Sequence, residues 1–167
     1  MTFRHLPAIS LRVSNIKLVS ETKHGIEPPQ IGHQFPTPPE KAITRWAEDR
    51  LQIGGGESGA GTALFTIIRA DAIEKDLKID TGVTGVFRKQ QSDRYTVTVE
   101  ARLDILDRRG VATAFATANA THSTTVGEDI SLHGRRQVWF ELVEKLMAEF
   151  DKTMEIQIRR NLDAYLR

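Results

Sequence analysis

Residues 135–165, RRQVWFELVEKLMAEFDKTMEIQIRRNLDAY, decide how the rest of the chain is organised. This stretch contains no glycine and no proline, and its apolar residues recur at intervals of three or four, the spacing of one face of an α-helix. The residues of that face are Trp139, Leu142, Leu146, Phe150, Met154, Ile158, Leu162 and Tyr165. At roughly 1.5 Å per residue the helix is about 45 Å long, more than the width of a small domain. The pattern predicts a long C-terminal helix over 135–166 that covers a sheet.

The two halves of this predicted helix differ in composition. The first half, 139–150, is densely apolar on one face, and we expect it to close the core. The second half, 154–166, is thinner and more charged. We expect this distal half to overhang the sheet, to pack on a proline-rich connector, or to meet another chain, which makes it the expected contact of a homo-oligomer.

The composition bounds the class of protein. The 167 residues suffice for one domain with a core, so we expect a single α+β domain over 1–167. A net charge of +1 disfavours a nucleic-acid partner. The absence of cysteine excludes disulfides, thiolate metal sites and a cysteine nucleophile. No apolar run approaches the roughly 18 residues of a transmembrane helix, so we expect no transmembrane span.

The first third of the chain predicts a strand, a connector and a helix. Residues 9–18 alternate between apolar and polar, and a change of phase at Ser14-Asn15 indicates a β-bulge. Residues 25–39 contain five prolines and form a proline-rich connector. Thr37-Pro38-Pro39-Glu40 then reads as a capping box that opens a helix over about 38–53, with Trp46 as its core anchor.

The middle of the chain predicts three further strands. Residues 62–79 form a long strand or a strand with a bend, and 80–93 form a hairpin loop without periodicity. Residues 95–105 alternate most regularly, and a turn at 107–110 ends in glycine and leads into a returning strand over 111–125. The order β-α-β-β-β-α predicts an α+β two-layer sandwich, a mostly antiparallel sheet covered by two helices. The first strand reaches its partner through a helical crossover, so this pair is expected to be parallel.

The returning strand carries a row of small residues on one face, namely Ala112, Ala114, Ala116, Ala118 and Ala120. Small side chains let a helix approach a sheet closely, so we expect this row to lie beneath a helix. In the alternative, the alanines face solvent and Thr113, Phe115 and Thr117 point inward.

No group of residues has a recognised catalytic or metal-binding spacing. The histidines (His5, His24, His33, His122 and His133) lie in predicted loops or near strand ends, without the pairwise spacing of metal ligands. The glycine-rich stretch 54–61 follows a helix and enters a strand, the reverse of a phosphate-binding loop. Glu100, Arg102 and Asp104 share a strand face, which either lines a polar site or is a solvated surface. We expect no enzyme, no cofactor and no metal.

One loop stands out as a contact surface. Apolar residues adjoin cations in the predicted hairpin loop, a combination found at protein-partner and membrane-interface contacts. These residues are Val83, Val86, Phe87, Arg88 and Lys89. In the alternative, Phe87 folds back as a lid over the core.

The order and hydrophobic rhythm of five stretches resemble small bacterial envelope lipoproteins, above all the lipopolysaccharide-assembly lipoprotein family and its uncharacterised α-proteobacterial relatives. The stretches are ISLRVSNIKLV, PPEKAITRWAEDRLQIGG, GTALFTIIRADAIE, RYTVTVEARLDILDRRG and WFELVEKLMAEFDKTM. The resemblance implies a non-catalytic periplasmic domain with an N-terminal lipid anchor, which binds a protein or lipid partner in outer-membrane or envelope assembly or transport. The auxiliary lipoprotein of a lipid-transport ABC system is a related expectation. Members carry a signal peptide and a lipidated cysteine before the domain, which we expect upstream of residue 1. A cytoplasmic location stays open.

Two other classes of function remain open. A soluble carrier would hold a hydrophobic ligand in a cavity between the sheet and the long helix. An enzyme, the weaker alternative, would use the polar face of Glu100, Arg102 and Asp104, and it requires a concave site with strongly shifted pKa values.

Overall fold

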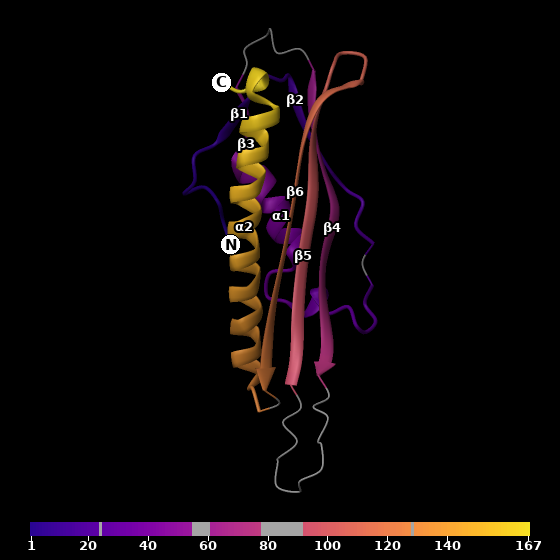
Figure 1. The fold of residues 1–167 in the computed structure, drawn as a ribbon, viewed down its shortest axis with the longest axis vertical. Coiled ribbons are helices and arrows are strands. Elements are labelled where there is room, and N and C mark those ends of the chain that lie inside the picture. Colours follow the sequence, from indigo (N-terminus) through magenta and orange to yellow (C-terminus); the bar gives the residue numbers. More distant parts are fainter. Residues whose placement is uncertain (24, 55–60, 78–91, 128) are drawn as a thin grey trace, which may run out of the picture.

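The computed structural model describes residues 1–23, 25–54, 61–77, 92–127 and 129–167. Two helices and six strands follow one another along the chain, with two short 3-10 helices (Figure 1). They are β1 (Ile9–Leu11), β2 (Asn15–Ser20), η1 (Gly32–Gln34), α1 (Pro39–Arg50), β3 (Leu51–Ile53), β4 (Thr62–Leu77), β5 (Ser92–Leu106), β6 (Ala112–Gly127), α2 (Leu132–Asn161) and η2 (Asp163–Tyr165). The predicted α+β sandwich with a mostly antiparallel main sheet is confirmed.

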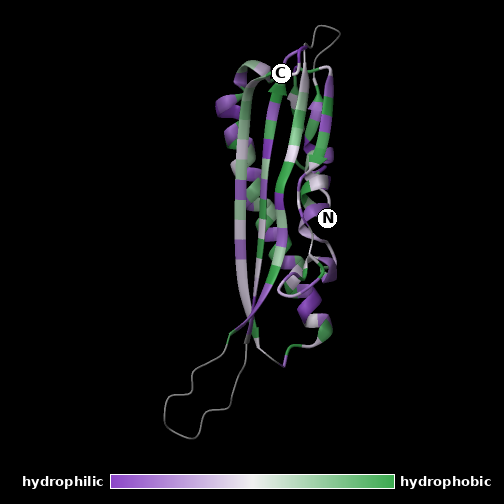
Figure 2. Ribbon diagram, turned by 90° about the vertical axis from the view of Figure 1, so that its right-hand side faces the viewer, coloured by the Kyte–Doolittle hydropathy of each residue, from purple (hydrophilic) through white to green (hydrophobic). Residues whose placement is uncertain are grey.

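The main sheet has the strand order β2-β4-β5-β6. β2 pairs with β4 in parallel after the crossover through α1, as expected, and the other neighbours are antiparallel. The turn between β5 and β6 closes at Gly110, which has a φ of 82°. The sheet twists strongly, so its strands spread apart at the lower end in Figure 1 and at the upper end in Figure 2. One predicted bend is present, because the register of β4 against β5 shifts between Ile67 and Arg69.

A second, two-stranded sheet corrects two predictions at once. β1 pairs in parallel with β3, so residues 9–18 are not one bulged strand but two strands in different sheets. The chain changes sheet at Ser14, whose backbone N–H and hydroxyl both donate to the Gly61 carbonyl. The predicted helix over 38–53 ends at Arg50, and the next three residues form β3. Leu51 is buried in β3, and it would also fit the apolar face of a longer α1. The apolar pattern alone therefore cannot place the boundary between α1 and β3.

The predicted capping box is wrong. The N-cap of α1 is Pro38, which has no side-chain acceptor. The Glu40 carboxylate accepts hydrogen bonds from the hydroxyls of Ser20 and Thr22, at 2.5 and 3.0 Å. Glu40 therefore ties α1 to the end of β2 instead of closing its own helix.

Both helices pack on one face of the main sheet, the inner face. α1 contacts β4 and β5, and α2 contacts β6 along its length and β5 more sparingly. Ala116, Ala118 and Ala120 are buried on this face, whereas Phe115 is 49% exposed. The expectation that the alanine row lies beneath a helix is therefore confirmed for its central residues.

Aromatic rings fill the space between the sheet and the two helices. The fully buried Trp46 ring lies 5.1 Å from the Phe150 ring in an edge-to-face arrangement and 5.6 Å from the Phe65 ring. Trp46 is thus the core anchor that the sequence predicts. These side chains occupy the region where a carrier would need its cavity, so the described core gives the carrier hypothesis no support.

The C-terminal helix is as long as predicted but its ends differ. It begins at Leu132, where the Ser131 hydroxyl accepts a hydrogen bond from the Gly134 N–H, and it ends at Asn161 rather than at 166. In Figure 1, α2 runs along nearly the whole length of the strands. The helix therefore spans the sheet without a kink-forming residue in its interior.

The distal half of α2 does not overhang the molecule. Met154 and Ile158 are fully buried, as is Leu162 just after the helix, whereas Ile156 is 53% exposed. The chain after α2 bonds to β1, since Arg12 N–H donates to the Tyr165 carbonyl and Arg167 N–H donates to the Ser10 carbonyl. The small β1–β3 sheet, which the sequence pattern did not predict, covers this distal half of α2.

Candidate functional surface

The face of the main sheet that points away from the helices, the outer face, carries the polar row predicted from the sequence. In Figure 2, α2 lies behind the strands, and hydrophobic and hydrophilic residues alternate along them. Glu100, Arg102 and Asp104 of β5 lie side by side on the outer face. The register pairs Asp104 with Phe115 of β6, Arg102 with Thr117, and Glu100 with Asn119. The residues of β6 that point outward are exposed, namely Phe115, Thr117, Asn119, Thr121 and Ser123.

Arg102 is the centre of this face. Its Nε lies 2.9 Å from both carboxylate oxygens of Asp104, and its guanidinium carbon lies 3.9 Å from the centroid of the Phe115 ring. The hydrogen bonds that Arg102 donates to Asp104 raise the pKa of Arg102. A cation over an exposed ring contributes about 0.5–1 kcal/mol.

Hydroxyl pairs continue the surface towards the other end of the sheet. The hydroxyls of Thr96 and Ser123 lie 2.9 Å apart, and those of Thr98 and Thr121 lie 3.2 Å apart. The outer face is thus a row of cross-strand polar pairs with one aromatic ring at its end. Such a row resembles a contact surface more than a reaction site, because its central cation, Arg102, is already paired with Asp104.

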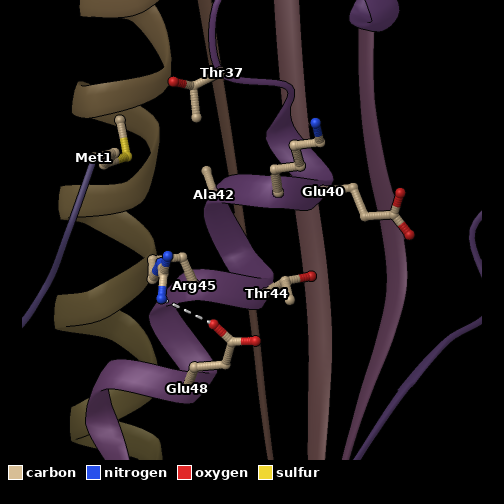
Figure 3. Close-up of a pocket in the computed structure, with 8 residues that line it drawn as sticks. Met1, Thr37, Glu40, Ala42, Thr44, Arg45 and Glu48 are labelled. Atoms are coloured by element: carbon tan, nitrogen blue, oxygen red, sulfur yellow. Dashed lines mark hydrogen bonds and ion pairs between the residues drawn. The ribbon is translucent and has the colours of Figure 1, made fainter.

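A hollow lies elsewhere, on the solvent side of α1. It has a volume of about 350 Å³ and is lined by Met1, Thr37, Glu40, Lys41, Ala42, Thr44, Arg45 and Glu48. In Figure 3, Met1 approaches from the side of α2, and the Glu40 carboxylate points away from the hollow. Arg45 is paired with Glu48 at 3.2 Å. The side chains of Glu40, Arg45 and Glu48 therefore do not converge on a common point in the hollow.

A second hollow of about 280 Å³ lies between the N-terminal segment and α2, lined by Met1, Thr2, Phe3, His5, Leu6, Glu144, Met147, Ala148 and Asp151. Its floor adjoins a buried ionic network that joins the two helices. Arg50, 1% exposed, donates to Asp151 at 2.8 Å and to Glu155 at 2.5 Å. The indole N–H of Trp46 donates to the same Asp151 carboxylate at 2.7 Å. Hydrogen bonds from Arg159 and Arg50 lower the pKa of Glu155.

A second polar contact holds the N-terminus. The buried carboxylate of Asp49 accepts hydrogen bonds from the Phe3 backbone N–H at 2.8 Å, the Thr2 hydroxyl at 2.9 Å and the Arg4 side chain at 3.2 Å. The bond from Phe3 N–H is the main reason why the pKa of Asp49 is lowered. The buried contacts of Asp49 and Arg50 were not predicted, because adjacent charges at the end of an amphipathic helix normally indicate a solvated face.

The residues predicted as a partner contact, Val83, Val86, Phe87, Arg88 and Lys89, lie outside the described residues, and most of the predicted loop over 80–93 does too. Residues 92 and 93 of that range already belong to β5. The partner contact therefore stays a prediction. Phe115 and the β6 row were not predicted as a site, although the alternation of the strand placed them opposite the alanines.

Within the described ranges, histidine and carboxylate side chains form no group of three or more that would hold a metal ion. No helix in the described part of the chain is long and apolar enough to cross a membrane.

Comparison with known proteins adds one structural similarity. No protein-family model matches the sequence, and a search of curated proteins gives no match either. The crystal structure of a minor lipoprotein from Acinetobacter baumannii is similar over 86% of this chain and 88% of that chain, with a TM-score of 0.35 and 13% sequence identity. This similarity does not assign the chain to the lipopolysaccharide-assembly lipoproteins, so that resemblance enters only as a proposal.

Proposed function

We propose that this chain is a non-catalytic binding domain of the bacterial envelope, whose working surface is the outer face of the main sheet. The observation that carries the binding role is the exposed pair of Phe115 and Arg102 on a sheet face that neither helix covers. Aromatic and arginine side chains are the residues most enriched at protein interfaces. The buried inner face is already occupied by the core, which leaves the outer face for a partner.

The envelope location rests on the resemblance of five sequence stretches to envelope lipoproteins. In this proposal an N-terminal lipid, attached upstream of the domain, holds it at a membrane in the periplasm. There the domain binds a protein or lipid component of outer-membrane assembly or transport. The Arg102–Asp104 pair, with the acidic Glu100 beside it, favours a protein partner, because a surface without a net excess of cations does not select anionic lipid headgroups.

Site-specific photocrosslinking in the native host tests the proposed surface. A photoreactive residue in place of Phe115 should yield one defined crosslinked species, whereas the same residue in place of Leu132, which is 80% exposed at the start of α2, should not. Crosslinking from Leu132 but not from Phe115 would place the contact elsewhere. Fractionation of the native gene product tests the location independently, with recovery in the membrane fraction expected and recovery in the cytoplasm contradicting it.

A further inference from the structure

The last strand of the main sheet has an open edge. β6 pairs with β5 on one side over residues 112–127, and no other described strand pairs with it. In an antiparallel ladder every second residue directs its N–H and C=O towards the neighbouring strand, and the residues between direct theirs away. Alternate residues of β6 therefore present backbone donors and acceptors at the edge of the sheet.

The opposite edge of the sheet is closed. β2 covers β4 from Thr62 to Ile67, and the proline-rich connector continues this cover. Ile31 N–H donates to the Ala72 carbonyl at 2.9 Å, and Glu74 N–H donates to the Pro29 carbonyl at 3.0 Å. A proline-containing segment lying along an edge strand is one of the devices that prevent further strands from adding.

From Ala114 to Gly127, β6 carries none of these devices; the one register shift against β5 lies at its first residues. Its sequence, ATAFATANATHSTTVG, contains no proline and no lysine, arginine, aspartate or glutamate. Its register against β5 is uninterrupted from Ala114 to Gly127, so no bulge turns this edge away. His122 is its one titratable side chain, and it contacts Glu149 of α2 at 2.7 Å. A long, regular and uncharged edge is a ready template for another strand.

The position of α2 limits what can add to this edge. α2 packs mainly on β6 (Figure 1), and Ala116 and Ala118 of β6 are buried. A helix is about 10–12 Å wide and neighbouring strands are about 4.8 Å apart, so the outer half of α2 extends over the place of the next strand. If two β6 strands paired antiparallel, their α2 helices would lie roughly 5 Å apart, whereas packed helices need about 8–10 Å. The site therefore accepts one strand without a helix above it, and it excludes an antiparallel pair of two copies of this domain.

We propose that the edge of β6 binds one extended segment of a partner polypeptide as a fifth strand of the main sheet. Backbone hydrogen bonds from alternate residues of β6 hold the segment, and α2 covers one of its faces. The segment carries apolar residues on the face beneath α2 and polar residues on the face that continues the threonine row. This inference goes beyond the proposed function, because it requires neither the envelope location nor the outer face.

A synthetic peptide with the sequence of residues 94–105, RYTVTVEARLDI, is the probe. This sequence already forms a strand beside β6, on the side opposite to the open edge, and it alternates between apolar and polar residues. We expect it to bind the full chain and to slow hydrogen exchange at alternate backbone amides of β6, those that do not bond to β5. Two N-methylated peptides serve as matched controls, one methylated at the positions copying Thr96 and Thr98, the other at those copying Val97 and Val99. One of the two should bind and the other should not, because only one set of N–H groups faces β6.

Three results would overturn the proposal. The first is the absence of protection in β6 at about 1 mM peptide, the weakest affinity at which a specific complex is useful. The second is equal binding of the two methylated peptides, which shows a contact through side chains alone. The third is protection of β6 in the free chain that rises with protein concentration, which makes a second copy the occupant. None of these results depends on crosslinking at Phe115, so the two proposals fail separately.

Discussion

The two edges of the main sheet differ in how the chain finishes them. At the β4 edge, β2 and the proline-containing connector that follows it lie along β4 and bond to its backbone groups. At the β6 edge, the chain leaves the sheet and enters α2, which covers a face of β6 and not its edge. The difference teaches that a long helix can complete the core of a small domain and still leave a sheet open to a partner.

The largest expected effect concerns the packing that holds the closed edge. Phe35 of the connector stacks on Trp139 with ring centroids 4.8 Å apart, and Tyr95 meets the same indole edge to face at 5.5 Å. Trp139→Ala should lower the free energy of unfolding by about 3–5 kcal/mol, because it removes a large buried side chain from both contacts. Chemical denaturation measures this change. Leu132→Ala, at an exposed position of the same helix, is the control, and an equal loss in both variants would contradict the assignment.

The ionic network between the helices is expected to have the next largest effect. Arg50→Ala leaves Asp151 and Glu155 without their buried cation, although both carboxylates are partly exposed. We expect a loss of about 2–3 kcal/mol in unfolding free energy, below the usual cost of a fully buried charge. Arg45→Ala removes an exposed pair of the same helix and should cost less than about 0.5 kcal/mol. If the Arg50→Ala and Arg45→Ala variants are equally stable, the ionic network between α1 and α2 is not what holds α2 over β6.

Acid should weaken the attachment of the N-terminus. Folding lowers the pKa of Asp49 below its ordinary value of 3.8, so its contribution is complete above that value and is lost as the pH falls towards the folded-state pKa. Asp49→Asn should cost about 1 kcal/mol at neutral pH and should flatten the decrease in stability below about pH 4. Thermal unfolding between about pH 3 and 7, roughly the range in which a carboxylate titrates, measures both the cost at neutral pH and the flatter decrease in acid. An unchanged pH profile in the variant would show that Asp49 does not carry this dependence.

The smallest expected effect lies beside the open edge. Phe115→Ala removes a half-exposed ring from Arg102 and should change the free energy of unfolding by less than about 1 kcal/mol. The same variant should reduce partner crosslinking from a neighbouring position such as Thr117. A loss of stability as large as that of Trp139→Ala would show that the outer face belongs to the core.

Much of this fold follows from periodicity in the sequence. The apolar face of 139–150 and the alanine row of β6 both predict the side that is buried, because burial follows directly from the 3.6- and 2-residue repeats. The distal half of α2 could not be placed in this way, since the β1–β3 sheet that covers Ile158 depends on two three-residue strands far apart in sequence. Such short strands have no periodic signal of their own. Leu51 shows the same limit, because its burial suits a helix end and a strand equally.

The candidate surface was predictable only in part. Alternation placed Glu100, Arg102 and Asp104 on one strand face, but the cross-strand contact with Phe115 depends on the register, which is a property of the folded hairpin. The difference between the two edges depends on the strand order and on the return of residues 29–31 to β4. Neither is encoded in any single stretch of sequence.

Residue-resolved hydrogen exchange of the isolated chain tests the central claim most directly. If the sheet ends at an open β6 edge, alternate backbone amides of β6 should exchange roughly 100-fold faster than those of β5, which has a strand on each side. The amides of Ile31 and Glu74, which close the opposite edge, should be protected. Uniform protection of β6 at the level of β5 would contradict the account, because it would show that this edge is already covered.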